Sequence, residues 1–340
     1  MAISSGAGPH RVFLVLNGAT FALDSAEVSL EATKKSGTFS ASLPLRLPGA
    51  RQALGPSLGD NTASIVVSTR GQQATLIAGE IDSVNFDYIG GMIKVSGRDA
   101  SAKLHGTKSA EKFVNQSPSA IISTIAGRVG LSANVDASAL KAGKIVEIDF
   151  AKMTDNVSLA HVVHKLADFL GAHWYVAGGQ LVVTAQPSSA SPYTINFNDT
   201  GGDVTADVKS LTISRNVQAG KGVTVNVKSW NSRKKAVYSG TYSIGGAGTS
   251  QNYNYHLPGL TQDHANQHAK AKAKDQARHE LTLSAELVGD PTILVSQPLL
   301  LVGTEYAQTF KIDSISHKCG MSGHTMSISA KSAAASRSGA

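Results

Sequence analysis

Alternation of apolar and polar positions along much of the chain predicts a mainly β protein. In residues 10–98, Phe39, Ala41 and Leu43 alternate with polar residues, and Asn17-Gly18 is a strong signal for a two-residue hairpin turn. Several short runs of this kind lie close together, which is typical of a small barrel or sandwich. Residues 1–98 are therefore predicted to form a first β-barrel domain.

The pattern changes to a helical period after Gly97. Asp99 is placed to cap a short helical turn, and Ser117-Pro118 marks the start of a longer helix. The clearest helix runs from Asn156 to Leu170 and is closed by a glycine. Its apolar stripe consists of Leu159, Val162, Val163, Leu166, Phe169 and Leu170. With the hairpin that follows, these elements predict a mixed α/β domain over residues 99–205.

Residues 206–332 return to the β pattern and predict a second β-barrel domain, with a helical insertion at about 258–280. An internal repeat links it to the first domain, because Glu80–Val84 (EIDSV) matches Lys311–Ile315 (KIDSI). Each segment precedes a turn and an alternating strand, which favours duplication of one unit. The fold is thus predicted to be mainly β with an α+β insert, two similar small antiparallel β-barrels flanking a mixed α/β domain. Residues 333–340 are predicted to be a disordered tail.

Composition narrows the cellular setting. Lysine and arginine exceed aspartate and glutamate to give a formal net charge of +7, spread along the chain, which does not argue for sequence-specific nucleic-acid binding. The single cysteine excludes an intramolecular disulfide framework. Because the sequence shows no apolar run of membrane-spanning length and no signal peptide, the protein is expected to be made and folded in a cytoplasm. The low charged fraction of 16% fits either a surface covered by partner chains or a Ser/Thr/Asn-rich exterior.

Histidine pairs are the first candidates for chemistry. His161 and His164 lie one helical turn apart, and His264 and His268 have the i, i+4 spacing that can hold zinc. Neither pair has a recognisable third ligand, so solvated helix faces are the favoured interpretation of both. His279-Glu280 begins an incomplete HExxH metalloprotease motif that lacks its second histidine.

No other motif points to catalysis. A G-x-S-x-G pattern occurs at Gly55–Gly59, but it lies in the long loop predicted over Leu45–Asp60 and not at the strand-to-helix turn of a nucleophile elbow, and no phosphate-binding G-x-x-x-x-G-K-[ST] loop occurs. Gly97-Arg98-Asp99 is interpreted as a helix cap beside a paired arginine. No catalytic, cofactor-binding or metal-binding residue is predicted, and the protein is not expected to be an enzyme.

The helix predicted over Thr261–Glu280 carries several basic residues, but acidic residues dilute the charge and no aromatic residue is placed to stack on bases. Its alanines, at i, i+4 intervals, form a narrow face suited to close packing. They are Ala265, Ala269, Ala273 and Ala277. Packing is therefore favoured over nucleic-acid binding.

The order of these motifs resembles the late control D family, the baseplate hubs of contractile-tailed phages, which are similar to the hub portion of type VI secretion spikes. The similarity covers roughly residues 79–330. It is carried by Gly97-Arg98-Asp99 between a strand and a helix, and by later steps of the chain. These steps are Trp230-Asn231 after a valine-rich strand, Pro258-Gly259 before an alanine-rich helix, Gly289-Asp290-Pro291, and Ile315-Ser316-His317. The chain departs from the family at Val295–Pro298, where a Pro-Gly is usual, and this affects only a loop.

The resemblance implies a structural hub of a phage tail, found in the virion baseplate. Such hubs are homotrimers in which two barrels per chain build a pseudo-six-fold ring between the six-fold tail tube and the three-fold central spike. The implied partners are the tube protein or its initiator, the spike protein and other baseplate proteins. The channel is expected to let DNA or a tape-measure protein pass, and to be lined by polar residues of balanced charge. The alternatives are a hub of a contractile injection or secretion apparatus and, less favoured, a baseplate-borne cell-wall hydrolase.

Overall fold

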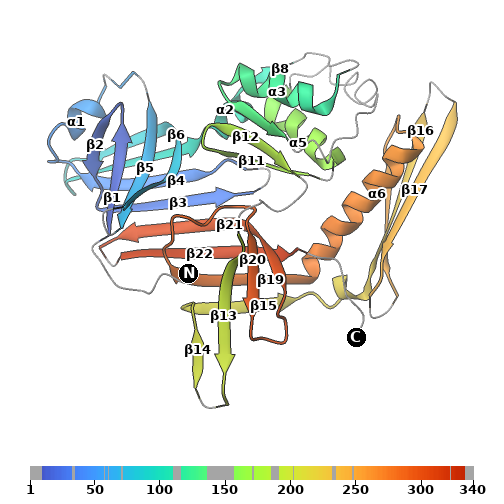
Figure 1. Ribbon diagram of the computed structural model, residues 1–340. Coiled ribbons are helices and arrows are strands. Elements are labelled where there is room, and N and C mark those ends of the chain that lie inside the picture. The colour runs from blue at the N-terminus through green and yellow to red at the C-terminus, as the bar shows by residue number, and fades with distance from the viewer. Residues whose placement is uncertain are drawn as a thin grey trace.

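The computed structural model describes residues 10–32, 35–56, 58–59, 61–69, 72–109, 116–135, 157–170, 172–184, 191–201, 203–231, 235–246, 249–321 and 323–333. The predicted tail lies outside this set beyond residue 333, as do Asn156 and Gly171, the predicted ends of the clearest helix, and the side chain of Phe169. Most of the described elements are strands, which confirms the predicted mainly β class (Figure 1).

The N-terminal β unit contains seven strands and one short helix. The strands are β1 (Arg11–Leu16), β2 (Ala19–Ala22), β3 (Ser25–Glu31), β4 (Thr38–Pro44), β5 (Thr62–Thr69), β6 (Gln72–Asp87) and β7 (Met92–Asp99), and the helix is α1 (Ala50–Ala53). Asn17 and Gly18 both have positive φ, as the predicted tight turn between β1 and β2 requires. Alternate side chains of these strands form one buried core that includes Leu14, Ile65 and Ile93.

The C-terminal β unit is built from seven strands that are not contiguous in sequence. They are β13 (Tyr193–Asp199), β14 (Val204–Ala206), β15 (Ser210–Arg215), β19 (Leu281–Val288), β20 (Pro298–Val302), β21 (Thr309–Gly320) and β22 (Gly323–Ser332). Phe310 is completely buried in the core of this unit. β13 and β14 had been predicted to belong to the mixed domain, but β13 pairs in parallel with β20, a partner about a hundred residues away that strand periodicity cannot reveal.

The mixed unit packs two helices against a small sheet. Its elements are α2 (Ser101–Gly106), β8 (Lys108–Ser109), α3 (Pro118–Arg128), β9 (Ser132–Val135), β10 (Val157–Ser158), α5 (Leu159–Leu170), β11 (His173–Ala177) and β12 (Gln180–Thr184). Ser117 caps α3 through a hydrogen bond accepted from the Ala120 N–H, as the Ser-Pro pair predicted. Trp174 of β11 is buried against both α3 and α5 in one core.

The remaining elements form an arm between β15 and β19. They are η3 (Ala219–Lys221), β16 (Val223–Asn231), β17 (Ala236–Ile244), β18 (Gln251–His256), α6 (Gln262–Ala277) and η4 (Arg278–Glu280). The predicted second barrel covered residues 206–332 apart from the helical insertion, but β16, β17 and β18 pair with one another in a separate sheet, and β18 was not predicted as a strand. Ala265, Ala269 and Ala273 are fully buried against this sheet, which confirms the predicted packing face. Gly240 permits the close approach, because a Cβ there would collide with the Ala265 backbone.

The two β units follow the same strand order. The N-terminal path is β3-β4-β7-β6-β5-β1-β2, and the C-terminal path is β15-β19-β22-β21-β20-β13-β14. One difference separates them, since β1 is antiparallel to β5 whereas β13 is parallel to β20. Closure of each unit into a barrel stays a prediction.

The two units are joined by one ladder. β21 is antiparallel to β3, with Ser314 opposite Glu31 and Cys319 opposite Ala26. The cores interleave at this junction, because Cys319 packs in the N-terminal core and Ala32 packs in the C-terminal one. Eight strands therefore run as one continuous antiparallel sheet in the order β15-β19-β22-β21-β3-β4-β7-β6 (Figure 1).

Candidate functional site

The histidine pairs are held in packing and polar contacts. His161 is exposed on α5, and the Nε2 of His164 lies 3.6 Å from Asp168 Oδ2, a carboxylate contact that sequence analysis did not foresee. His264 and His268 are buried on α6 instead of solvated as predicted, and burial lowers the pKa of His268 to about 4. Over the described part of the chain, no group of three His, Cys, Asp or Glu residues is placed to hold a metal ion.

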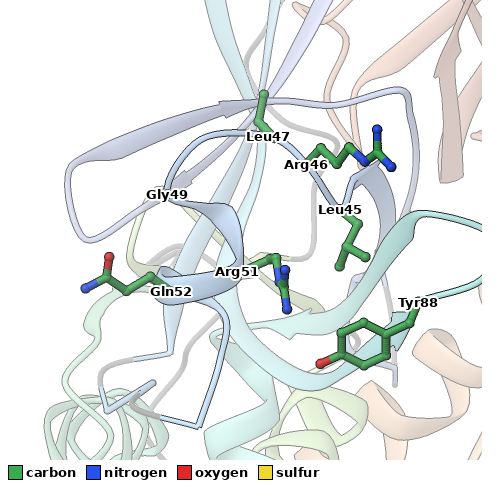
Figure 2. Close-up of a pocket in the computed structure, with 7 residues that line it drawn as sticks. All are labelled: Leu45, Arg46, Leu47, Gly49, Arg51, Gln52 and Tyr88. Atoms are coloured by element: carbon green, nitrogen blue, oxygen red, sulfur yellow. The ribbon is translucent and has the colours of Figure 1, made fainter.

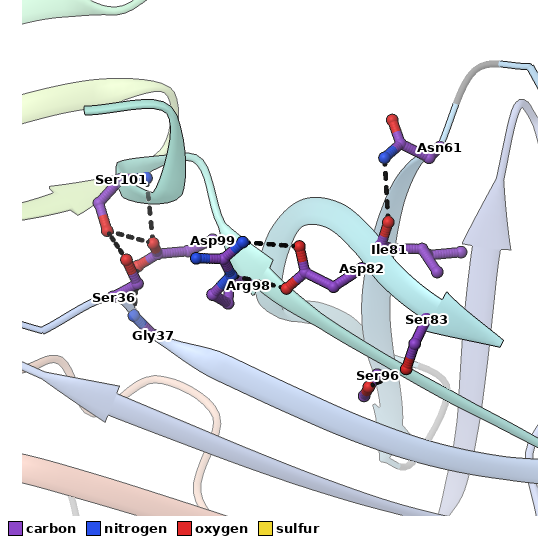
Figure 3. Close-up of polar contacts among 10 residues, drawn as sticks. All are labelled: Ser36, Gly37, Asn61, Ile81, Asp82, Ser83, Ser96, Arg98, Asp99 and Ser101. Atoms are coloured by element: carbon purple, nitrogen blue, oxygen red, sulfur yellow. Dashed lines mark hydrogen bonds and ion pairs between the residues drawn. The ribbon is translucent and has the colours of Figure 1, made fainter. Parts of the chain in front are cut away.

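Gly97-Arg98-Asp99 ends β7, where the N-terminal β unit meets the mixed unit, and Figure 3 shows the contacts of Arg98 and Asp99. The guanidinium of Arg98 donates two hydrogen bonds to Asp82, at 2.6 and 2.8 Å. The Asp99 carboxylate accepts hydrogen bonds from the Ser101 N–H at the start of α2 and from the Gly37 N–H, at 3.0 and 2.9 Å. The predicted paired arginine is confirmed, whereas the N-cap residue of α2 is Ala100 and not Asp99 as predicted.

The repeated segments occupy matching places in matching hairpins. β6 pairs with β7, and a β-bulge at Asp82 separates the pairs Ile81↔Gly97 and Ser83↔Ser96. β21 pairs with β22, and a bulge at Asp313 separates Ile312↔Ala330 and Ser314↔Ser329. A bulge places one extra residue on one strand, so a shared bulge at the same step is a specific structural match.

Each bulged aspartate pairs with a cation at the corresponding position of the next strand. Arg98 pairs with Asp82 and Lys331 pairs with Asp313, the latter at 3.1 Å. The surroundings differ, because Asp313 also receives a 2.9 Å hydrogen bond from Arg278 at the end of the arm. Burial alone would raise the pKa of Asp313, but the Arg278 and Lys331 charges outweigh it and hold the pKa below its usual value.

A buried cluster around Asp313 joins three units of the molecule. Arg278 also lies 3.1 Å from His173 of the mixed unit, and burial, aided by the charges of Lys311 and Arg278, lowers the pKa of His173 to about 3. Lys311 is only 4% exposed, and burial lowers its pKa to about 7. Sequence analysis found the KIDS segment but missed this cluster, because no local pattern shows that a helix end 35 residues earlier returns to Asp313.

One face of the eight-stranded sheet covers the two cores, and the other carries short polar side chains. A row that crosses the sheet illustrates the second face: Val288, Thr325, Lys318, Glu27, Ser40, Ser96 and Ser83, of which Val288 is an exposed apolar residue. Lys318 and Glu27 form an ion pair at 3.6 Å in this row. Serine and threonine are the commonest residues of this row, and elsewhere on the polar face Lys94 lies between Ser42 and Asn85.

Two equivalent hairpin turns expose apolar side chains at the same end of this sheet. Ile89 follows β6 and is 100% exposed, while Met321 follows β21 and is 94% exposed. Beside the first turn lies a hollow of about 610 Å³ lined by residues of the β4–α1 region and by Tyr88 (Figure 2). The Arg51 guanidinium lies 5.6 Å from the centre of the Tyr88 ring.

Both insertions leave from the other end of the sheet. β7 runs away from its turn and ends at Asp99, where the mixed unit begins, and β15 ends at Arg215, where the arm begins. Figure 1 accordingly places the hairpin turns toward the left and the mixed unit and arm toward the right. At the far end of the arm, Trp230 and Val237 are opposite each other and exposed by 55% and 65%. No helix of the described residues is long and apolar enough to cross a membrane.

Comparison with protein-family models and with curated protein sequences finds no match. Solved structures do match. A tail protein from Neisseria meningitidis MC58 has a TM-score of 0.74 at 13% identity, with 95% of this chain and 96% of that chain covered. The 43 kDa tail protein of prophage MuSo2 from Shewanella oneidensis has a TM-score of 0.69 at 14% identity, covering 96% and 99%.

A component of the type VI secretion system of E. coli is also similar, with a TM-score of 0.57 at 9% identity, covering 93% of this chain and 76% of that one. The predicted resemblance to phage tail hub proteins and type VI spike proteins is thereby confirmed as a similarity of fold.

Proposed function

We propose that this chain is the structural hub of a phage tail baseplate, a homotrimer that joins a six-fold tail tube to a three-fold central spike. The single observation that carries the proposal is an asymmetry between the two ends of the eight-stranded sheet. One end bears two equivalent hairpin turns per chain, whereas the other bears one mixed unit and one arm per chain. Three chains would then present six alike turns at one end and three alike insertions at the other.

The turns supply the contact for the tube. Ile89 and Met321 have no cover in the single chain, and large exposed apolar side chains at equivalent sites fit a partner that repeats the same pocket six times. Tyr88 and Arg51 add an aromatic and cationic contact beside the first turn (Figure 2). At the opposite end, Trp230 and Val237 of the arm are the apolar residues available to a three-fold spike.

The polar face is assigned to the channel wall. Lysine and arginine bind DNA through its phosphates, so a densely cationic wall would hold DNA. On this face Lys318 is neutralised by Glu27 and Arg98 by Asp82, among many serine and threonine side chains. Such a wall fits the passage of DNA or of a tape-measure protein, as the sequence predicted for a hub.

A hub of a contractile injection or secretion apparatus is the second candidate, favoured by the match to the type VI component. The two candidates share the same ring and the same two ends. The partner at the spike end separates them, because a phage baseplate and a secretion apparatus carry different tips. The solved structures that share this fold are tail and secretion proteins, which supports a structural role over a hydrolase.

Variants at the two ends test the proposal in tail particles. Ile89→Asp with Met321→Asp is expected to yield baseplates that keep the spike but lose the tube, because charge in an apolar contact is costly. Val237→Asp is the control, because Val237 is also an exposed aliphatic residue but lies at the other end, and it should leave tube attachment unchanged. Electron microscopy of the particles reads out both. Tube loss from the Val237 variant, with normal tubes in the double variant, would overturn the assigned orientation.

A further inference from the structure

β21 and β3 are joined edge to edge within the chain, whereas their equivalents in the strand order, β6 and β15, are not joined to each other. The Ser314–Cys319 part of β21 pairs with β22 on one side and with β3 on the other. The matching part of β6, Ser83–Asp87, pairs with β7, and over the described residues no ladder occupies its other side. β15 matches β3 in the strand order, and among the described strands it pairs with β19 alone.

The two edges carry apolar side chains that are covered in their equivalents. Ile315 and His317 are each 1% exposed beneath β3, whereas the matching residues Val84 and Phe86 are only half-buried. On the opposite edge, Val28 of β3 is fully buried and the matching Ile213 of β15 is half-buried. The free edges of β6 and β15 therefore expose apolar side chains, and the β21–β3 ladder covers the equivalent side chains within the chain.

The contrast is larger at the ends of the ladder. Cys319 is 6% exposed, and its equivalent after β6, Tyr88, is 65% exposed. Ala32 is 1% exposed, and its equivalent after β15, Val217, is 63% exposed. Tyr88 and Val217 are thus exposed at the positions whose equivalents, Cys319 and Ala32, are buried in the β21–β3 junction.

We propose that β6 of one copy pairs antiparallel with β15 of the next copy, with Phe86 opposite Ile213. This register transfers the β21–β3 ladder, in which His317 is opposite Val28, to the equivalent strands. It sets Asn85 opposite Ser214 on the polar face, and it sets Tyr88 opposite Leu211 on the apolar face. The proposal rests on the proposed hub function, because it specifies how neighbouring chains of the ring meet.

The strand directions make a second copy the occupant. All eight strands of the continuous sheet alternate in direction from β15 to β6, so the next strand after β6 must run as β15 does to stay antiparallel. Joining two different edges of identical chains is a heterologous contact, which closes into a ring when the rotation permits. An unpaired strand edge with apolar flanks is otherwise a site of uncontrolled association.

Disulfide trapping tests the register in the full-length protein. Asn85→Cys with Ser214→Cys puts two thiols at an opposed pair, whose Cα atoms should lie within the roughly 4.4–6.8 Å that a disulfide spans. Asn85→Cys with Thr212→Cys is the matched control, since the diagonal neighbour lies at about 7–8 Å. The native Cys319 is buried and can stay in both variants. After mild oxidation, the in-register variant is expected to give covalent trimers faster than the control, because only its opposed pair lies within the Cα separation that a disulfide spans.

Native mass measurements on the same samples separate the possible failures. A trimer in solution with no preference for the in-register pair would overturn this pairing and leave the hub proposal standing. Disulfide trapping accumulates even weak contacts. If the protein stays monomeric at high concentration and forms no in-register adduct, both the pairing and the trimer are contradicted. Ile213→Lys adds a second readout. Placing a charge in the half-buried row should abolish trapping and mass increase while the monomer stays folded by circular dichroism, and an unchanged trimer would contradict the proposal.

Discussion

The hairpins β6–β7 and β21–β22 share a sequence pattern, a register and a bulge, but their aspartates lie in different surroundings. Asp82 meets Arg98 at the surface, where both side chains are more than a third exposed. Asp313 lies among Arg278, Lys331 and Lys311 in a buried cluster that ties the arm and the mixed unit to the sheet. The same local pattern thus sets the same backbone geometry, while long-range packing decides what each charge contributes.

The largest effect is expected at Lys311. The matching residue of the other hairpin, Glu80, carries the opposite charge. Because its folded pKa is lowered to about 7 from 10.5, the unfolded chain binds the proton more readily between these values. The free energy of unfolding should therefore rise with pH through that window, and the full cost of the buried charge is present below pH 7. Lys311→Met should stabilise the protein by up to about 5 kcal/mol near pH 6 and by about 1 kcal/mol near pH 10. Denaturant melts at both pH values measure this, and an equal change at both would refute the buried-charge account.

The two aspartates should respond differently to removal. Asp313→Ala leaves buried cations without their carboxylate and is expected to cost about 3–5 kcal/mol. Asp82→Ala removes an exposed ion pair and is expected to cost less than about 1 kcal/mol, although the Arg98 hydrogen bond lowers the pKa of Asp82. Chemical denaturation of both variants at neutral pH compares them. Similar losses would mean that the environments of the two bulges are equivalent after all.

Gly97 and Ala330 are matched positions with different room. A Cβ at Gly97 would collide with the Phe39 ring and with the Glu80 carbonyl oxygen. In the C-terminal β unit, the matching residue Ala330 has a Cβ and is opposite Leu283. Gly97→Ala is expected to cost about 2–3 kcal/mol by overpacking, and Ala330→Gly about 1 kcal/mol through backbone entropy. Thermal unfolding of the two variants checks this order, and a smaller loss in Gly97→Ala than in Ala330→Gly would contradict the overpacking at Gly97.

Much of this architecture could be predicted from local sequence, and the parts that could not depend on distant partners. Period-two alternation located most of the strands but not β18, and the IDS repeat located the matched hairpins. Alternation does not say which sheet a strand joins, so β13–β14 and β16–β18 were assigned to the wrong units. The histidines of α6 were predicted to be solvated because helical periodicity alone cannot show that the arm sheet and the mixed unit cover them. The free edges of β6 and β15 became visible only when the two strand orders were compared.

The most direct test of the central claim is a cryo-electron microscopy structure of the assembled particle that contains this chain. The account predicts three copies around the axis, with six alike β units in one ring and the Ile89 and Met321 turns toward the six-fold tube. The polar face of the eight-stranded sheet should line the channel. Any other copy number around the axis, or a ring in which the β6 edge meets no β15 edge of a neighbouring chain, would contradict it.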